Sequence, residues 1–193
     1  MKTFFFSDPH FGHANVIGYQ DRPFRSVGEM DETIIRNWNS VVSEDDHVFL
    51  LGDVTFYKGE KAIEVLYALN GKISLILGNH DQRKRMEETD RFEHISSYPV
   101  LFDEFFLLSH EPVFLTEQSP FCNIHGHFHQ AEDIPPFVAP LNINVSAECI
   151  NYTPISYSDV KRIEGVRPRM SKFGKMRPVN VERHAETNRL RNG

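Results

Sequence analysis

The sequence predicts an α/β fold built around two β-sheets. In its first half, short apolar runs alternate with segments whose apolar residues recur every three or four positions. This strand-helix-strand order is typical of a parallel sheet with right-handed crossovers. In the second half, apolar runs follow one another with only loops between them, which favours a second, mixed or antiparallel sheet packed against the first. With 193 residues, the chain is long enough for one domain with a sizeable core and a tail.

The first half supplies three strands and three helices. The strands are expected at 2–7, 47–51 and 73–77, and the helices at 29–42, 58–69 and 82–89. Segment 8–27, between the first strand and the first helix, is expected to be a polar loop. The first helix would share one apolar face among Ile34, Ile35, Trp38, Val41 and Val42. The second would turn Ile63, Leu66 and Leu69 inward and stop at Gly71.

The second half is expected to add four strands, at 98–102, 104–109, 121–125 and 143–146. A final capped helix is expected at 156–163. Beyond it the chain carries two prolines and many charges with little apolar periodicity. We therefore expect a single domain over 1–165 and a basic C-terminal extension over 166–193, extended or partly disordered.

Charge is distributed unevenly along the chain. From Lys161 onward there are ten Lys and Arg against three Asp and Glu, whereas residues 1–160 hold eleven against twenty-four. An acidic body argues against a broad nucleic-acid surface and fits carboxylates that hold cations. The basic tail is interpreted as solvated charge, with contact to nucleic acid or to an acidic partner as the alternative.

Compartment and membrane association are judged from the apolar runs and the cysteines. The longest apolar runs are too short to cross a bilayer, and no signal peptide is recognised at the N-terminus. Cys122 and Cys149 are not spaced as a metal-binding pair. A reduced, cytoplasmic protein is the simplest interpretation, and one disulfide between these two cysteines stays open.

Residues that can bind metals follow five of the predicted strands. Seven of the ten histidines lie in these segments or just after one, at His13. Asp, His and Asn without Cys favour borderline or hard divalent metals. Their number exceeds what one tetrahedral zinc needs, whereas two ions sharing a carboxylate would use them all. The segments are Asp8-Pro9-His10, Gly52-Asp53, Gly78-Asn79-His80-Asp81, His110 and His125-Gly126-His127-Phe128-His129.

This ordered set resembles the calcineurin-like metallophosphoesterases over roughly residues 3–150. The opening segment 7–15 also resembles a small bacterial and phage branch of predicted phosphoesterases. The resemblance implies a four-layer αββα sandwich, with two mixed central sheets flanked by helices. It also implies two divalent ions (manganese, iron, zinc or nickel). The implied ligands are Asp8, His10 and His129 for the first ion, Asn79, His110 and His127 for the second, and Asp53 as the bridge.

The resemblance implies a catalytic role for His80, and residues near the motifs are candidates for further roles. His80 would contact the phosphate and protonate the leaving oxygen, after attack by a hydroxide held between the metals. Asp81 would orient the ring of His80 or else cap the helix that follows. His13, Asn15 and Arg22 are the candidates for substrate contact, with pairing to the acidic body as the alternative for Arg22. His125 is expected to be structural.

The predicted function is metal-dependent hydrolysis of phosphate esters. A phosphodiesterase is favoured over a monoesterase, acting on a small or nucleotide-like substrate. No arginine follows Asp53, unlike the protein phosphatase branch of the family, which disfavours a phosphoprotein substrate. The alternatives are a nuclease with the same centre and a metal-binding scaffold with weak catalysis. The physiological substrate, the native metal and the oligomeric state stay open.

Overall fold

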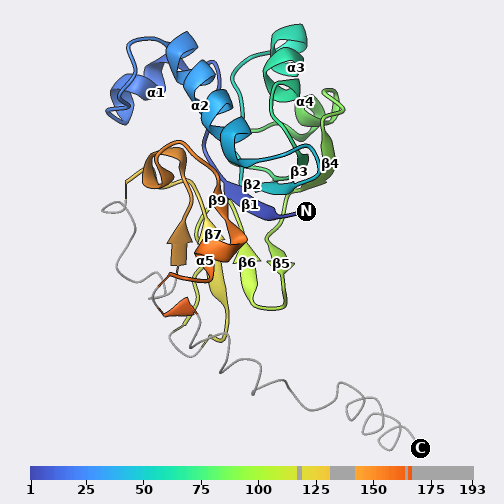
Figure 1. The fold of residues 1–193 in the computed structure, drawn as a ribbon, viewed down its shortest axis with the longest axis vertical. Coiled ribbons are helices and arrows are strands. Elements are labelled where there is room, and N and C mark those ends of the chain that lie inside the picture. Colours follow the sequence, from blue (N-terminus) through green and yellow to red (C-terminus); the bar gives the residue numbers. More distant parts are fainter. Residues whose placement is uncertain (117–118, 131–141, 164, 167–193) are drawn as a thin grey trace, which may run out of the picture.

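The structure is a computed structural model that describes residues 1–116, 119–130, 142–163 and 165–166. Within these residues two β-sheets stack face to face and are flanked by helices (Figure 1). The first sheet has the order β4 (Phe92–Ser96), β3 (Lys72–Ile76), β2 (His47–Leu50), β1 (Thr3–Phe6) and β9 (Ile155–Ser156). The second has the order β5 (Val100–Phe102), β6 (Phe106–Leu108), β7 (Cys122–His125) and β8 (Asn142–Asn144).

Both sheets are mixed. Strands β1 to β4 run parallel and β9 pairs antiparallel to β1. In the second sheet β6, β7 and β8 run parallel and β5 pairs antiparallel to β6. A parallel bridge between Ser7 and Ser146 joins the two sheets just beyond β1 and β8. The carboxyl ends of the parallel strands in both sheets therefore meet, and the residues that follow them share one region.

Four helices cover the outer face of the first sheet (Figure 1). They are α1 (Ala14–Tyr19), α2 (Val27–Val41), α3 (Gly59–Tyr67) and α4 (Arg83–Glu87). Helix α2 begins where the Ser26 hydroxyl accepts the Glu29 N–H, which satisfies a free backbone donor. A short helix α5 (Tyr157–Val160) follows β9, after a 3₁₀ turn at Ala147–Ile150. The predicted α/β fold with two mixed sheets flanked by helices is confirmed.

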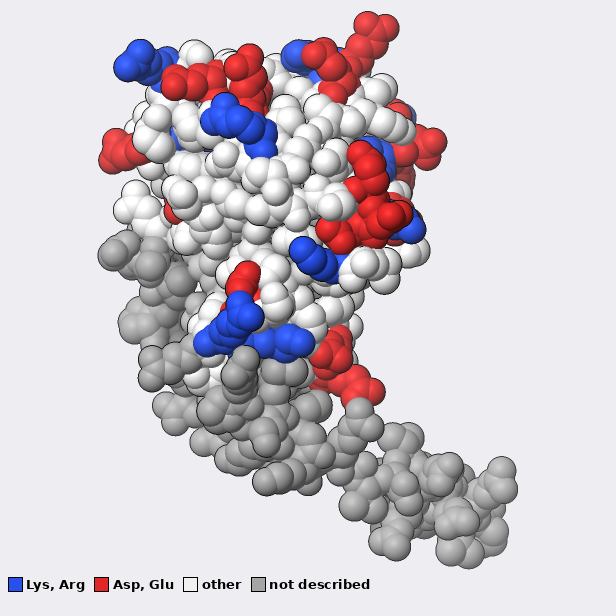
Figure 2. Space-filling model, in the orientation of Figure 1, with Lys and Arg blue, Asp and Glu red and all other residues white. Residues whose placement is uncertain are grey.

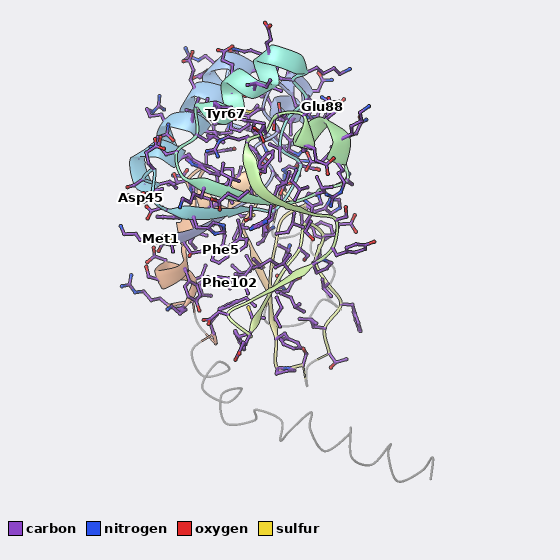
Figure 3. All side chains as sticks on the ribbon, turned by 90° about the vertical axis from the view of Figure 1, so that its right-hand side faces the viewer. Met1, Phe5, Asp45, Tyr67, Glu88 and Phe102 are labelled. Atoms are coloured by element: carbon purple, nitrogen blue, oxygen red, sulfur yellow. The ribbon has the colours of Figure 1, made fainter. Side chains whose placement is uncertain are left out.

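Two apolar cores result from the alternation of side chains along the first sheet. Phe4 and Phe6 face the helices and pack with Ile34 and Trp38, all of them buried. Phe5 points the other way, into the space between the sheets, with its ring 5.7 Å from that of Phe102 (Figure 3). Each such fully buried side chain stabilises the fold by about 1.5–3 kcal/mol. Together the cores hold β1 and β2 rigidly beneath the segments that follow them.

Some elements differ from the sequence-based predictions. Helix α1 lies inside the predicted polar loop, and it forms through packing of Val16 rather than through strong helix formers. Strands β4 and β9 were not predicted; β4 is a polar edge strand and β9 has two residues. In α3 the predicted inward Ile63 is 39% exposed. The true inner face, spaced i, i+3, i+4 and i+7, consists of Ala62, Val65, Leu66 and Leu69.

Three further predictions concern the cysteines, the membrane and the tail. Cys122 is buried and Cys149 is exposed, and these two cysteines form no disulfide with each other. Among the helices described, none has the length and apolar character to cross a bilayer. The predicted C-terminal extension lies almost wholly outside the described residues; its first residue, Val166, is fully buried in the core between the sheets.

Candidate metal centre

Three predicted ligands meet on one side of the region between the strand ends. The Asp8 Oδ1 atom lies 3.8 Å from His10 Nε2 and 4.0 Å from His129 Nε2. The other Asp8 oxygen, Oδ2, accepts hydrogen bonds from the His127 N–H and the Ser146 hydroxyl. Asp8 Oδ1 and His10 Nε2 are buried and have no hydrogen-bond partner among the described residues. Buried polar atoms seldom stay unpaired, so this arrangement indicates a missing ligand.

Three other predicted ligands meet on the opposite side. The Asn79 Oδ1 atom lies 2.9 Å from His110 Nε2 and 3.2 Å from His127 Nδ1, and these two ring nitrogens are themselves 3.2 Å apart. His110 Nδ1 lies 2.7 Å from the Leu51 carbonyl, to which it must donate. The Nε2 atom of a neutral His110 ring therefore carries the lone pair. A cation at this position would be held by this lone pair and by the Asn79 oxygen.

Asp53 lies between the two groups. Its Oδ2 atom is 3.6 Å from His10 Nε2 and 3.6 Å from His110 Nε2, and the residue is only 3% exposed. Its Oδ1 atom accepts a hydrogen bond from the His80 N–H. One carboxylate oxygen is thus free to face both groups of ligands.

The chain reaches this geometry by unusual backbone conformations at the strand ends. Asp8, His10, Asp53 and His127 have φ angles of 57°, 53°, 52° and 68°. This left-handed region costs a non-glycine residue about 1–2 kcal/mol. Such strain is typically concentrated at functional sites, where the surrounding structure compensates for it.

Close approach of the loops also requires glycine. A Cβ atom on Gly126 would lie 1.9 Å from Ser7 Oγ and 2.3 Å from Asp8 Oδ2. One on Gly52, at φ +90°, would lie 2.5 Å from the Gly78 nitrogen. The glycines of the motifs therefore let the loops of the two sheets come together around the ligands.

The charge balance of the centre fits divalent cations. Burial opposes ionisation of Asp8, but the nearby imidazoles of His110, His129 and His10 outweigh it and hold its pKa below the usual value. Burial raises the pKa of Asp53, and the neighbouring charge of Asp8 adds to this. Burial lowers the pKa of His10 to about 2, which leaves its ring neutral. Two buried carboxylates beside the neutral ring of His10 are a favourable site for positive charge, which bound divalent ions would supply.

Glu148 is a residue of the centre that the sequence analysis missed. Its Oε1 atom lies 2.9 Å from His129 Nδ1 and accepts the Arg22 Nε–H at 2.7 Å. Although burial disfavours the imidazolium, the Glu148 carboxylate raises the pKa of His129. A carboxylate on the outer nitrogen of a histidine fixes the ring so that the other nitrogen can bind a metal.

His80 and Asp81 are neighbours in the sequence, but their side chains lie in different surroundings. The His80 side chain is 49% exposed, and its Nε2 atom lies 4.0 Å from Asp53 Oδ2, at the open side of the centre. Asp81 accepts backbone N–H groups: Oδ2 those of Asp53 and Gly78, and Oδ1 that of Val54. Its carboxylate joins the loops after β2 and β3, whereas the N-cap position of α4 is Gln82, whose side chain makes no capping hydrogen bond. Neither role expected for Asp81, orienting His80 or capping a helix, describes these contacts.

The three residues predicted to contact the substrate lie in different places relative to the centre. His13 lies beside the centre, with its ring 5.5 Å from that of His10 and stacked on Phe56. Asn15 is exposed on α1 and takes no part in the contacts described above. The Arg22 side chain is fully buried, and besides Glu148 it donates to the carbonyls of Asp8 and Pro9. Arg22 therefore supports the first metal-ligand loop from behind, which corresponds to the second interpretation given for it.

His125 has the structural position expected of it. Its side chain is fully buried, with Nδ1 2.8 Å from the Gly126 carbonyl and Nε2 3.1 Å from Asn142 Oδ1. Both ring nitrogens are therefore occupied outside the centre.

An open groove of about 400 Å³ adjoins the centre on the side of the second sheet. Its lining includes the two candidate ligands Asn79 and His110 together with Tyr98, Pro99 and Pro112. Part of the centre therefore borders this open groove.

Comparison with known proteins agrees with this arrangement. The sequence profile of the family "Calcineurin-like phosphoesterase" matches residues 1–168. The uncharacterized protein MJ1445 of Methanocaldococcus jannaschii is 42% identical over 165 residues, covering 80% of this chain and 86% of that protein. The Gene 66 protein of Mycobacterium phage L5 is 34% identical over 105 residues, or 53% of this chain and 50% of that protein.

A solved structure is also similar. It is the crystal structure of the protein of unknown function AQ665 from Aquifex aeolicus, with a TM-score of 0.67 and 26% identity. The match covers 84% of this chain and 98% of that one. It extends the likeness from the sequence motifs to the whole arrangement of sheets and helices.

Proposed function

This chain belongs to the calcineurin-like phosphoesterase family of metal-dependent hydrolases, and we propose that it hydrolyses phosphodiesters of small or nucleotide-like molecules. The observation that carries the proposal is the meeting of two ligand groups on either side of Asp53, with the exposed His80 ring beside them. The motifs of the family, far apart in the sequence, come together there as one site.

We assign the ligands as follows. Asp8, His10 and His129 would hold one divalent ion, Asn79, His110 and His127 would hold a second, and Asp53, which lies between the two groups, would contribute to both. When bound, such ions lower the pKa of water and neutralise charge on the phosphoryl oxygens. Borderline metals suit these ligands, with manganese the first to test and iron, zinc and nickel as the others.

His80 is proposed as the general acid. Its backbone N–H is fixed to Asp53 Oδ1, while its ring stays half exposed at the mouth of the centre. An imidazole titrates close to neutral pH and can give a proton to the leaving oxygen of a bound ester. The arrangement holds the ring next to the metal ligands without making it one of them.

One observation supports a diester as the substrate. A monoester carries up to two negative charges and a diester one, so a monoester site benefits from a further cation at the phosphate. The arginine nearest in sequence to the first motif, Arg22, is turned away and buried against Glu148. Cytoplasmic location is part of the proposal, and the lack of a disulfide between Cys122 and Cys149 is consistent with a reducing compartment.

A nuclease receives no specific support from the described residues. On the face drawn in Figure 2, acidic and basic side chains are intermixed over the helices instead of forming a continuous basic area. The basic tail on which that alternative rested lies outside the described residues.

The experiment compares hydrolysis of bis-p-nitrophenyl phosphate and p-nitrophenyl phosphate by metal-stripped protein, with and without added manganese. We expect metal-dependent turnover, faster for the diester. His80→Ala should keep its bound metal and lose about 10²–10⁴-fold in kcat. His94→Ala, which removes an exposed histidine from β4, is the matched control and should keep full activity.

Two results would contradict the proposal. Equal turnover with and without each of manganese, nickel, zinc and iron would rule out metal-dependent hydrolysis of these esters. Full activity of His80→Ala would remove the assigned general acid even if the metals are required.

A further inference from the structure

An exposed aromatic side chain lies directly beside the metal centre. Phe56 is 38% exposed, with its ring centroid 5.8 Å from that of His10 and 5.4 Å from that of His80. The Phe56 ring also stacks on that of His13, with centroids 3.9 Å apart and planes 17° apart. Tyr19, 73% exposed, lies edge-on to His13 at 6.4 Å. We call Phe56, His13 and Tyr19 the aromatic ledge.

The ledge is held in place by backbone contacts. The Phe56 N–H donates to the Phe11 carbonyl, and Phe11 and Thr55 form a parallel bridge. The loops after β1 and β2 therefore run side by side past the ligands. An exposed phenylalanine on so fixed a backbone does not gain its position from burial in the core.

A second set of contacts holds the same loop against α2 and Gly12. The Tyr57 hydroxyl donates to Asp31 Oδ2, and Asp31 Oδ1 accepts the Gly12 N–H. Gly12 packs so closely on the Tyr57 ring that a Cβ there would lie 2.8 Å from it. The loop carrying Phe56 is thus tied to α2 and to the loop carrying His13, which makes the ledge preorganised.

We propose that the aromatic ledge binds the nucleobase of a nucleotide substrate by stacking on Phe56, while the phosphate occupies the adjoining centre. The inference rests on the proposed function, because it places the ester at the metal ligands. Bases stack on aromatic side chains whatever their sequence, and the Phe56 ring lies 5.8 Å from that of the candidate ligand His10 and 5.4 Å from the half-exposed ring of His80. A nucleobase stacked on Phe56 would therefore allow the phosphate of the same nucleotide to lie beside the ring of His80.

The test measures binding of two probes by calorimetry to the full-length, manganese-loaded protein. Adenosine 5′-monophosphate carries base, sugar and phosphate, whereas ribose 5-phosphate lacks the base. We expect the nucleotide to bind about tenfold to a hundredfold more tightly, in line with the usual contribution of one stacked base. Phe56→Leu should remove most of this excess and leave ribose 5-phosphate binding unchanged, and Phe56→Trp should retain it.

Tyr98→Leu is the matched control. Tyr98 is 77% exposed and lines the groove on the other side of the centre, so it is the aromatic side chain that a base in the groove would meet. The nucleotide should still bind more tightly than ribose 5-phosphate in Tyr98→Leu.

The inference is overturned if the nucleotide has no excess affinity, if the excess survives in Phe56→Leu, or if it is lost in Tyr98→Leu instead. It is also overturned if Phe56→Leu weakens both probes equally, since Phe56 would then only shield His10. Binding does not require turnover, so a protein that binds the nucleotide through Phe56 but hydrolyses no ester would refute the proposed function and leave the ledge standing.

Discussion

Glu148 lies outside every motif of the family, yet it connects a buried arginine to a histidine that faces the metal centre. The Arg22 side chain is fully buried and the Glu148 side chain is 13% exposed, so the pair is largely removed from water. Removing one partner of such a pair leaves a buried charge uncompensated and costs several kcal/mol. Glu148 is therefore a positioning residue that acts on the metal through His129.

We expect Glu148→Gln to lower the affinity for manganese about tenfold or more, as is usual when the outer partner of a ligating histidine is lost. Glutamine keeps the volume of the side chain but has no negative charge to pair with Arg22. Titration of the metal-stripped variant against a competing chelator measures the affinity. Glu64→Gln is the control, since Glu64 has a side chain 69% exposed on α3 and should leave the affinity unchanged. An unaltered affinity in Glu148→Gln would show that the contact with His129 does not matter for metal binding.

The burial of His10 predicts how the stability of the metal-stripped protein depends on pH. Burial lowers the pKa of His10 to about 2 in the folded protein, while in the unfolded chain it is near 6.5. Below pH 6.5 the unfolded chain therefore binds a proton that the folded protein does not. His10 then makes the free energy of unfolding fall by about 1.4 kcal/mol per pH unit as the pH decreases from 6 to 4.

Urea unfolding of the metal-stripped protein at pH 6, 5 and 4 measures this slope. Other histidines also titrate in this range, so His10→Gln is the comparison. Its free energy of unfolding should fall less steeply with decreasing pH, by about 1.4 kcal/mol per pH unit. Identical slopes for the two proteins would mean that His10 is protonated in the folded state.

At the scale of elements, the segments after the strands matter more than the strands. The loops after β1, β2 and β7 carry Asp8, Asp53 and His127 with left-handed backbone angles, and Asp81 fastens the loops after β2 and β3 through three backbone N–H groups. The strands supply a rigid edge, while the loops determine where each ligand atom lies. A change of one methyl group in a loop should therefore disturb the centre more than a similar change in a helix.

Two glycine substitutions test this difference. Gly126→Ala would place a methyl group against Ser7 and Asp8, whereas the same change at Gly18 on α1 meets nothing within 4 Å. We expect Gly126→Ala to lose at least tenfold in manganese affinity because Asp8 must shift. Gly18→Ala should keep the affinity and stabilise its helix by up to about 1 kcal/mol. Equal affinities for the two variants would show that the loops tolerate the extra atom.

At the scale of the whole molecule, the centre joins the two sheets. Asp8 and Asp53 follow strands of the first sheet, and His110 and His127 follow strands of the second. Ions held by both groups would bind only the folded protein, so their binding energy adds to its stability. With free manganese at 100 times its dissociation constant, the free energy of unfolding should rise by about 2.7 kcal/mol per site.

Denaturant unfolding at increasing manganese concentration measures this effect. His94→Ala should show the same rise as the unmodified protein, whereas Asp53→Asn should lose most of it because the shared ligand is weakened. A midpoint that does not move with manganese would mean that the metal does not link the sheets.

Elements that depend on the local sequence pattern could be predicted, whereas those that depend on tertiary packing could not. The strands of the first sheet and helix α2 follow from apolar periodicity, and the ligand segments were visible because metal-binding residues come after those strands. Ile63 was assigned to the wrong face of α3 because two overlapping apolar patterns exist in the same segment, and only packing against the first sheet selects Ala62 and Val65. Helix α1 is likewise stabilised by tertiary contacts, since its own sequence gives little helical preference.

Contacts between distant residues were beyond sequence reasoning. Glu148 is 126 positions from Arg22 and has no pattern around it that indicates a role. Asp81 was expected to act on its neighbour His80 or on the following helix, but its partners Asp53 and Val54 lie 28 and 27 positions away. Phe56 was one of several phenylalanines near the motifs, and only the structure shows that it is the one exposed beside His80.

The Ser7–Ser146 bridge between the sheets has a consequence for how the protein is made. His129 and the Glu148 that orients it come late in the chain, and Asp8 comes almost first. A polypeptide leaving the ribosome presents Asp8, His10 and Asp53 long before their remaining partners exist. Contacts between segments so far apart in sequence form slowly and only after the chain has closed on itself. We therefore expect the metal ions to bind only after the chain has been synthesised and folded, and a chain that ends before His127 would lack candidate ligands for both ions.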